Sequence, residues 1–423
     1  MNKQPYTLPP RWWGPELSPF IVRLTRGYRR WQLRSRQRIQ QVRVHGADNL
    51  RGALAAGQGV LITPNHAAHY DSTALYLAAD QLNTPLYYMT AWQVFGMSSI
   101  WERTLMQRMG CFSIDRESAD RKAFKQAVEI LRLEPHPLVV FPEGDIYHIT
   151  DRVTPFREGA AAIALAASRR STRPVVIVPC GIKFLYLDDP TTELETLMTL
   201  LDERLFLRPQ RTHSLAQRIY RYAEALLALK EIEFMGTTQA GPLASRIKRL
   251  AHSILSEMEA RHRLSTATRA TPDRVKELRQ KIIQGLDPYK KKRKRWNEPE
   301  FLSLSRDMDD LFLVMQLYSY PGDYLTENPS IERLAETLDK FEEDVLDRPI
   351  PSVKGRRRVE VSFGVPISVP AEADRRRAVT ELTRQMHAAV QSQIDGLCDG
   401  LCDGLREAPV AATAREAAAT MLS

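Results

Sequence analysis

Residues 59–71 read GVLITPNHAAHYD, and this stretch decides the class of fold. Its first half is a short apolar and β-branched run, which predicts a buried strand. Pro64 is expected to end that strand, because proline cannot donate to a sheet ladder. Asn65 and His66 then lie on the following loop, and Asp71 comes close to an apolar helical pattern over residues 72–79. Open α/β sheets carry their functional loops at this edge, outside the carboxyl ends of the strands.

The pair His66 and Asp71 is typical of a general-base device. A carboxylate beside one ring nitrogen fixes the tautomer and steadies the imidazolium, so the other nitrogen can take a proton from a hydroxyl. The chain has nine histidines. At that frequency a His-x4-Asp pair arises by chance roughly once in every two chains of this length, so the assignment needs support from other motifs.

The composition is that of a globular protein with an anionic partner. A chain of 423 residues can form one large domain with an insertion, or two to three smaller domains. The formal net charge of +9 points to a membrane surface, a nucleic acid or a phosphorylated ligand. Four cysteines form no disulfide framework and favour a reducing compartment. Cys398 and Cys402 lie in the repeat DGLCDGLCDGL, which we interpret as a tandem duplication rather than a metal site.

Residues 1–40 predict a basic amphipathic segment that associates with a membrane. Apolar residues recur every three or four positions with arginines between them, a pattern typical of an interfacial anchor on anionic lipid. The apolar residues are Phe20, Leu24, Tyr28 and Trp31. The same pattern fits a helix that packs on the main domain and exposes its basic face to water. No stretch has the roughly 18–20 apolar residues of a membrane span, and a signal-peptide core is missing. We therefore expect a cytoplasmic protein, peripheral on the inner face of a membrane.

Strand and helix patterns alternate through residues 41–187. Strands are predicted at 42–44, 60–63, 85–90, 110–114, 138–141 and 175–178, the last stopped by Pro179, and helices at 95–109, 119–133 and 156–168. This order predicts an α/β fold, a mixed sheet covered by helices on both faces.

Residues 188–355 have long charged helical patterns and predict a large, mainly helical insertion. Its helices are expected around 191–204, 215–230, 243–263, 272–284, 304–317 and 331–346. Strand character returns at 358–363, so the core is expected to resume over 356–405 and to end in a helix over 372–394. Residues 406–423 predict a mobile tail. Within the insertion, the run KKKRKR at 290–295 fits a nuclear import signal, a nucleic-acid contact, an anionic-lipid contact or a solvated loop. We interpret it as a solvated loop or, failing that, an anionic-lipid contact.

Four blocks follow predicted strands in order: NHAAHYD (65–71), GCFSIDR (110–116), FPEG (141–144) and VP (178–179). Together they resemble the glycerolipid acyltransferase family, whose members acylate glycerol 3-phosphate and lysophosphatidic acid. The resemblance covers about residues 40–187 and returns at VEVSFGVPI (359–367), which is similar to the family's closing strand.

The resemblance implies direct acyl transfer from acyl-CoA or acyl-carrier protein, as co-substrate, to a hydroxyl of a glycerolipid or lysophospholipid. His66 would be the general base and Asp71 would orient it. No cofactor or metal is implied. The chain has no Gly-x-Ser-x-Gly nucleophile elbow, which agrees with transfer that forms no covalent acyl-enzyme.

The resemblance also implies the residues that bind the acceptor. Arg116 and the turn at Glu143 and Gly144 would contact it, with Asn65 beside them, and an arginine suits a bidentate contact with phosphate. Two alternatives remain open from the residues alone. Arg116 can form a salt bridge with Asp115, and Glu143 can be only a turn residue.

Two of the blocks depart from the family pattern. Ala68 stands where a serine is usual, and Asp145 and Ile146 stand where a hydroxyl residue and an arginine usually follow the Glu-Gly pair. An acid in place of an arginine makes the pocket less favourable for a phosphate monoester. We expect either that Arg152 or Arg157 replaces the arginine, or that the acceptor is not a lysophosphatidic acid.

Three further residues near the predicted site have no assigned role. His69 is expected to pack or to make a hydrogen bond rather than react, and His148 and Asp151 are interpreted as loop residues. Two other functions also stay open. One is a basic nucleic-acid-binding protein, which leaves the four blocks unexplained and has no recognition motif, so no nucleic acid is expected. The other is a degenerate homologue that binds lipid without turnover.

Overall fold

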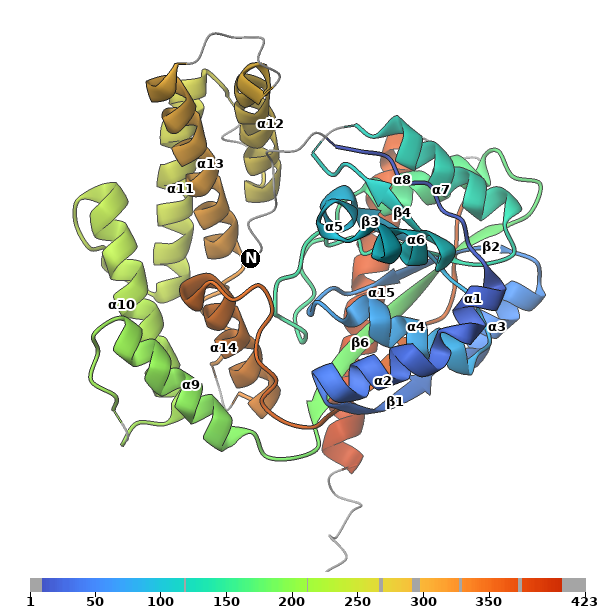
Figure 1. Ribbon diagram of the computed structural model, residues 1–423, viewed down its shortest axis with the longest axis horizontal. Helices are drawn as coiled ribbons and strands as arrows, with labels where there is room; N and C mark the ends of the chain where they lie inside the picture. The colour runs from blue at the N-terminus through green and yellow to red at the C-terminus, as the bar shows by residue number, and fades with distance from the viewer. Residues whose placement is uncertain are drawn as a thin grey trace, which may run out of the picture.

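The computed structural model describes residues 10–404 except 118, 211, 266–268, 291–296, 327–328 and 372–374. The tail at 406–423 and residues 291–295 of the basic run therefore lie outside the described residues. The described chain forms two parts, a sheet flanked by helices and a separate block of helices beside it (Figure 1).

The sheet has eight strands in the order β1-β7-β6-β2-β5-β3-β4, with β8 beside β6. Their bounds are β1 (Ile39–His45), β2 (Gly59–Pro64), β3 (Tyr87–Ala91), β4 (Cys111–Ile114), β5 (Leu138–Val139), β6 (Val175–Tyr186), β7 (Arg357–Phe363) and β8 (Ile367–Ser368). Strands β7 and β8 run antiparallel to β6, and the other neighbours are parallel. The predicted mixed sheet is confirmed.

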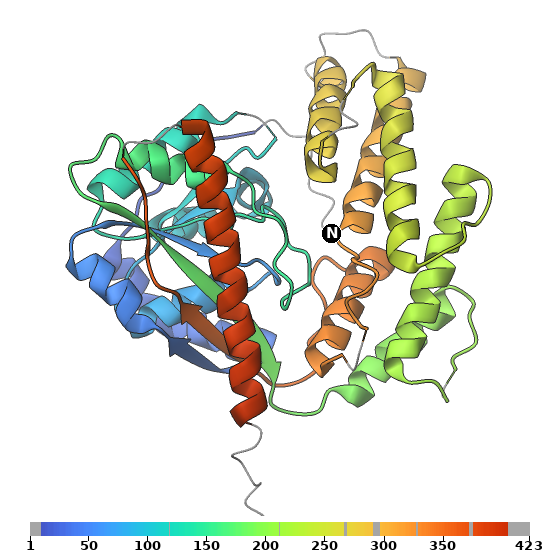
Figure 2. The same ribbon diagram turned by 180° about the vertical axis from the view of Figure 1, so that it is seen from behind.

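Helices cover both faces of the sheet, also as predicted. One face carries α2 (Arg26–Gln37), α3 (Ala47–Ala55) and α4 (Asp71–Gln81), and the other carries α7 (Arg121–Leu133), α8 (Gly159–Ser168) and α15 (Arg375–Gly404). Figure 2 shows α15 lying along the sheet. In β2, Val60 and Ile62 join the first core and Leu61 the second. Successive side chains of a strand point to opposite faces, so burial on both sides explains the unbroken apolar run.

The prediction that Pro179 stops its strand is wrong. Strand β6 runs through Pro179 to Tyr186. Pro179 lacks only the N–H, and its carbonyl still accepts a hydrogen bond from the Gly364 N–H at 2.8 Å. Beyond it, β6 pairs antiparallel with β7, from Cys180 opposite Phe363 to Tyr186 opposite Arg357. Pairing with β7 therefore keeps residues 180–186 in the strand, and the local sequence around Pro179 does not reveal that partner.

The predicted N-terminal helix is two helices, α1 (Pro19–Leu24) and α2, which meet at Thr25. Its buried face consists of Val22, Arg29 and Leu33, and the guanidinium of Arg29 contacts both carboxylate oxygens of Asp80 on α4 at 2.7 Å. The aromatic and aliphatic stripe faces away from the core. The exposed fractions are 71% for Phe20, 68% for Leu24, 50% for Tyr28 and 54% for Trp31.

Helices α5 (Trp92–Met97) and α6 (Ile100–Arg108) replace the single helix predicted at 95–109. Ser99 begins α6 with a capping box, because its side chain accepts from the N–H of Glu102 while the Glu102 carboxylate accepts from the Ser99 N–H. No helix in the described part of the chain is both long and apolar enough to cross a membrane.

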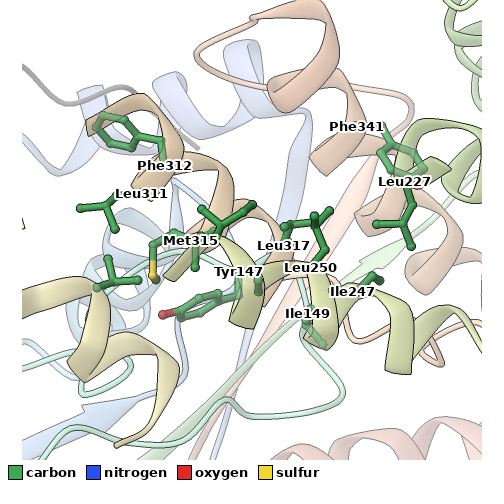
Figure 3. Packing of buried hydrophobic residues seen from close by; sticks show 14 of the residues in the cluster. Tyr147, Ile149, Leu227, Ile247, Leu250, Leu311, Phe312, Met315, Leu317 and Phe341 are labelled. Carbon is green, nitrogen blue, oxygen red and sulfur yellow. The ribbon is translucent and has the colours of Figure 1, made fainter. Parts of the chain in front are cut away.

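The helical block lies between β6 and β7 in the chain. It comprises α9 (Thr191–Arg204), α10 (Leu215–Met235), α11 (Leu243–His262), α12 (Thr271–Lys290), α13 (Glu298–Tyr318) and α14 (Ile331–Leu346). Because Tyr186 pairs with Arg357, the chain leaves and re-enters the sheet at one point. The block has its own apolar core, and Tyr147 and Ile149 from the loop between β5 and α8 reach into it (Figure 3).

Candidate active site

The loop after β2 is anchored by Asn65. Its side-chain amide donates to the carbonyl of Ile182 on β6 at 3.0 Å, and its amide oxygen accepts from the Ile182 N–H at 2.7 Å. Asn65 is 1% exposed. The side chain suggested as a substrate contact therefore pairs with the backbone of β6, at the part of that strand beyond Pro179, and it holds the loop in place.

His66 and Asp71 form the pair that their spacing suggests. His66 Nδ1 lies 2.9 Å from Asp71 Oδ2, and the Ala68 N–H donates to the same oxygen at 2.8 Å. Asp71 is the first residue of α4 and is buried, whereas the His66 side chain is 20% exposed. The Phe141 ring stacks on the imidazole at 4.2 Å between centroids. With Nδ1 facing the carboxylate, Nε2 is the nitrogen placed to exchange a proton with a substrate.

Glu143 supports the backbone of His66. Its Oε1 accepts a hydrogen bond from the His66 N–H at 2.6 Å, and its Oε2 accepts from the N–H and the hydroxyl of Thr154. Burial raises the pKa of Glu143 to about 8, although the bonds from Thr154 and His66 act in the opposite direction. Glu143 is therefore more than a turn residue, because it joins three segments around the histidine.

Two of the predicted arginines meet at the turn that follows. Arg116 Nη1 donates to the carbonyl of Gly144, and the Arg157 side chain lies over that residue. Gly144 has φ +78°, and a Cβ there would lie 2.7 Å from Arg157 Nε, so only glycine fits. Arg152 is directed elsewhere. Its side chain is 51% exposed and pairs with Asp323 at 2.7 Å.

A third arginine, Arg279 of α12, had no signal in the sequence that pointed to this site. Its Nη1 lies 2.7 Å from Glu117 Oε1, beside Arg116. Burial acts to raise the pKa of Asp145, but the charges of Arg116, Arg157 and Arg279 hold it below its usual value. The acid that departs from the family pattern is thus offset by the charges of three arginines. Arg279 and Glu117 are 162 residues apart, so only the tertiary structure brings them together.

Three side chains connect the loops after β2 and β5 to the helical block. His69 Nε2 and His148 Nε2 lie 2.7 Å and 3.0 Å from the same oxygen, Oε1 of Glu343 on α14. The ligand atoms of all three lie within 4.8 Å of one another, which is close enough to hold a metal ion. Burial acts to raise the pKa of Glu343, but the bonds from His148 and His69 bring it well below its usual value. His69 thus makes the hydrogen bond expected of it.

The loop residues His148 and Asp151 are more constrained than their sequence indicated. His148 is 5% exposed and adopts a left-handed conformation with φ 52°. Asp151 forms ion pairs with Lys183 of β6 and Arg333 of α14, which hold its pKa below the usual range against the effect of burial. Both side chains thus attach the loop after β5 to the helical block.

Comparison with known families agrees with this architecture. The structure is that of an α/β protein that carries a histidine and a carboxylate at the carboxyl end of a central strand. Residues 41–183 match the family model described as Acyltransferase, the domain of glycerolipid acyltransferases, so this chain carries an acyltransferase-family domain. The match ends before α9, and the helical block lies outside it. No curated protein sequence matches the chain significantly.

Proposed function

We propose that the protein moves a fatty acyl group from acyl-CoA or acyl-carrier protein to a hydroxyl of a glycerolipid or lysophospholipid. The observation that carries this proposal is the 2.9 Å contact between His66 Nδ1 and Asp71 Oδ2 at the carboxyl end of β2, inside the acyltransferase-family segment. A histidine held in this way suits removal of a proton from an acceptor hydroxyl.

The reaction needs one proton relay and no covalent acyl-enzyme. His66 Nε2 takes the hydroxyl proton while the acceptor oxygen attacks the thioester carbonyl, and the C–S bond then breaks. The thiolate leaves with the proton from the imidazolium, and Asp71 steadies the transient positive charge. Cys180 does not suit the role of nucleophile, because burial raises the pKa of its thiol far above neutral pH.

The direct test is thiol release from palmitoyl-CoA by the purified protein, with and without a panel of glycerol-phosphate and lysophospholipid acceptors. We expect release that depends on an acceptor and a matching acylated product. Release without an acceptor would indicate a thioesterase. If neither palmitoyl-CoA nor palmitoyl-acyl-carrier protein reacts with any acceptor, the protein is a binding-only homologue and the proposal fails.

The positive charges of Arg116, Arg157 and Arg279, which all act on Asp145, favour an acceptor that carries phosphate. With Arg279→Ala we expect the KM for glycerol 3-phosphate or a lysophosphatidic acid to rise roughly 10- to 100-fold, the worth of one charge-assisted hydrogen bond. The kcat should change little, and an acceptor without phosphate, a monoacylglycerol, should be unaffected. The control is Arg152→Ala, since Arg152 is half exposed and pairs with Asp323. An equal loss for both kinds of acceptor would limit Arg279 to a structural role.

We also propose that the exposed stripe on α1 and α2 contacts a membrane on its cytoplasmic face. The four side chains, Phe20, Leu24, Tyr28 and Trp31, are each at least half exposed. The double variant Phe20→Ser, Trp31→Ser should weaken co-sedimentation with anionic vesicles by roughly 10- to 100-fold, because two large apolar side chains no longer enter the interface. Phe206→Ser is the control, because Phe206 is 96% exposed on the helical block. An unchanged partition of the double variant would place the membrane contact elsewhere.

A further inference from the structure

The helical block contains a cavity of about 340 Å³, within the range of sites that hold small molecules, roughly 300–1,000 Å³. Helices α10, α11, α13 and α14 form much of its wall, together with the loop at 319–325 between α13 and α14. Tyr147, His148 and Ile149 of the loop after β5 also line it. Five residues of this wall, Tyr147, Ile149, Leu227, Ile247 and Leu317, are labelled in Figure 3.

The wall of the cavity is mainly apolar. Most of its residues are aliphatic or aromatic, and three of the polar ones gather around one carboxylate. Asp344 accepts hydrogen bonds from Gln316 Nε2 at 3.0 Å and from the Tyr320 hydroxyl at 2.9 Å, and Lys340 Nζ lies 3.1 Å from the same carboxylate. A ligand here gains mainly by burying hydrocarbon, because aliphatic and aromatic side chains make up most of the wall.

Side-chain contacts link the cavity wall to the candidate active site. His148 forms part of the wall, and its imidazole meets the Glu343 carboxylate oxygen that His69 also contacts. His69 is three residues after His66 in the same short loop. Two side-chain contacts therefore connect the cavity wall to the loop that carries the proposed base.

We propose that this cavity holds the fatty chain of the acyl donor. The inference rests on the proposed function. It means that the helical block, which lies outside the acyltransferase-family segment, determines which acyl chain lengths the protein accepts. A chain seated here has its reactive end toward the His148 side and its methyl end among α10, α11 and α13. Each additional buried methylene should tighten binding about fourfold until the cavity is full.

Binding can be measured without turnover, so this inference is tested separately from the reaction. Parinaric acid, a fluorescent C18 fatty acid, is titrated into wild type and into His66→Ala and is displaced with fatty acids of 8 to 18 carbons. We expect saturable binding to both proteins, with affinity rising with length to a plateau. No saturable binding to either protein would overturn the inference, whereas turnover retained by His66→Ala would overturn only the proposed mechanism.

A matched pair of alanines locates the chain. Ala223 of α10 lines the cavity, and Ala225 lies on the opposite side of the same helix and is not part of the wall. Ala223→Phe should weaken binding of C16 and C18 acids at least tenfold and leave C8 and C10 acids nearly unchanged, and Ala225→Phe should bind all lengths as wild type does. Equal binding of long chains by both variants would place the chain elsewhere.

Photo-crosslinking provides a second measurement on the unmodified sequence. Palmitoyl-CoA with a diazirine at the chain end should label peptides of α10, α11 or α13. A lysophospholipid with the same group should label them weakly. Labelling confined to the sheet part of the chain would contradict the proposal, and stronger labelling by the lysophospholipid would assign the cavity to the acceptor chain instead.

Discussion

His66→Ala is expected to lower turnover by roughly 10²- to 10⁴-fold, which is the usual contribution of a positioned general base. The imidazole is held by Asp71 at 2.9 Å and by the stacked ring of Phe141, so alanine removes the proton acceptor. Turnover is measured as acceptor-dependent thiol release at saturating donor. The loss should appear in kcat, because the side chain acts on the reacting hydroxyl.

The control for this prediction is His45→Ala. His45 also ends a strand, but it lies on the edge strand β1 and pairs with Glu360 at 2.8 Å. It should retain wild-type turnover, and both variants should unfold at temperatures close to that of wild type. Asp71→Asn should lose a large part of the activity as well, because an amide cannot steady the imidazolium. Turnover of His66→Ala within a few fold of wild type would remove this histidine from the mechanism.

Asp80→Ala is expected to reduce the free energy of unfolding by about 3–5 kcal/mol. Arg29 is 3% exposed, and its guanidinium binds both oxygens of Asp80, the Thr25 hydroxyl at 2.6 Å and the Val22 carbonyl at 3.0 Å. Without the carboxylate, a positive charge stays buried among neutral groups. The measurement is urea unfolding followed by circular dichroism.

The control for Asp80 is Asp48→Ala on α3. Asp48 is almost fully exposed and pairs with Arg51 at 3.5 Å. Exposed pairs contribute about 0–1 kcal/mol, so this variant should be nearly as stable as wild type. Equal losses in the two variants would show that the buried pair does not attach α2 to the core. Because α2 carries part of the exposed stripe, Asp80→Ala should also weaken vesicle binding.

The local pattern of the sequence was sufficient for most elements and for the heart of the site. The helices expected at 191–204 and 331–346 have those bounds in the structure, since apolar periodicity and end signals lie within each segment. The His66–Asp71 pair was also visible, because five residues connect a strand end to the first turn of a helix. The predicted end of β6 at Pro179 was wrong, because β6 continues by pairing with β7, which lies about 180 residues away in the chain.

The α/β order, the histidine–aspartate pair and the acyltransferase blocks could be predicted from the sequence, because each depends on residues close together in the chain. How the helical block meets the site could be learned only from the folded molecule. It brings Arg279 to Glu117 and Glu343 to His69, and it directs Arg152 to Asp323 rather than to the turn at Gly144. These contacts join residues more than 150 positions apart, and no periodicity or spacing specifies them, because they depend on how two separately packed cores dock against each other.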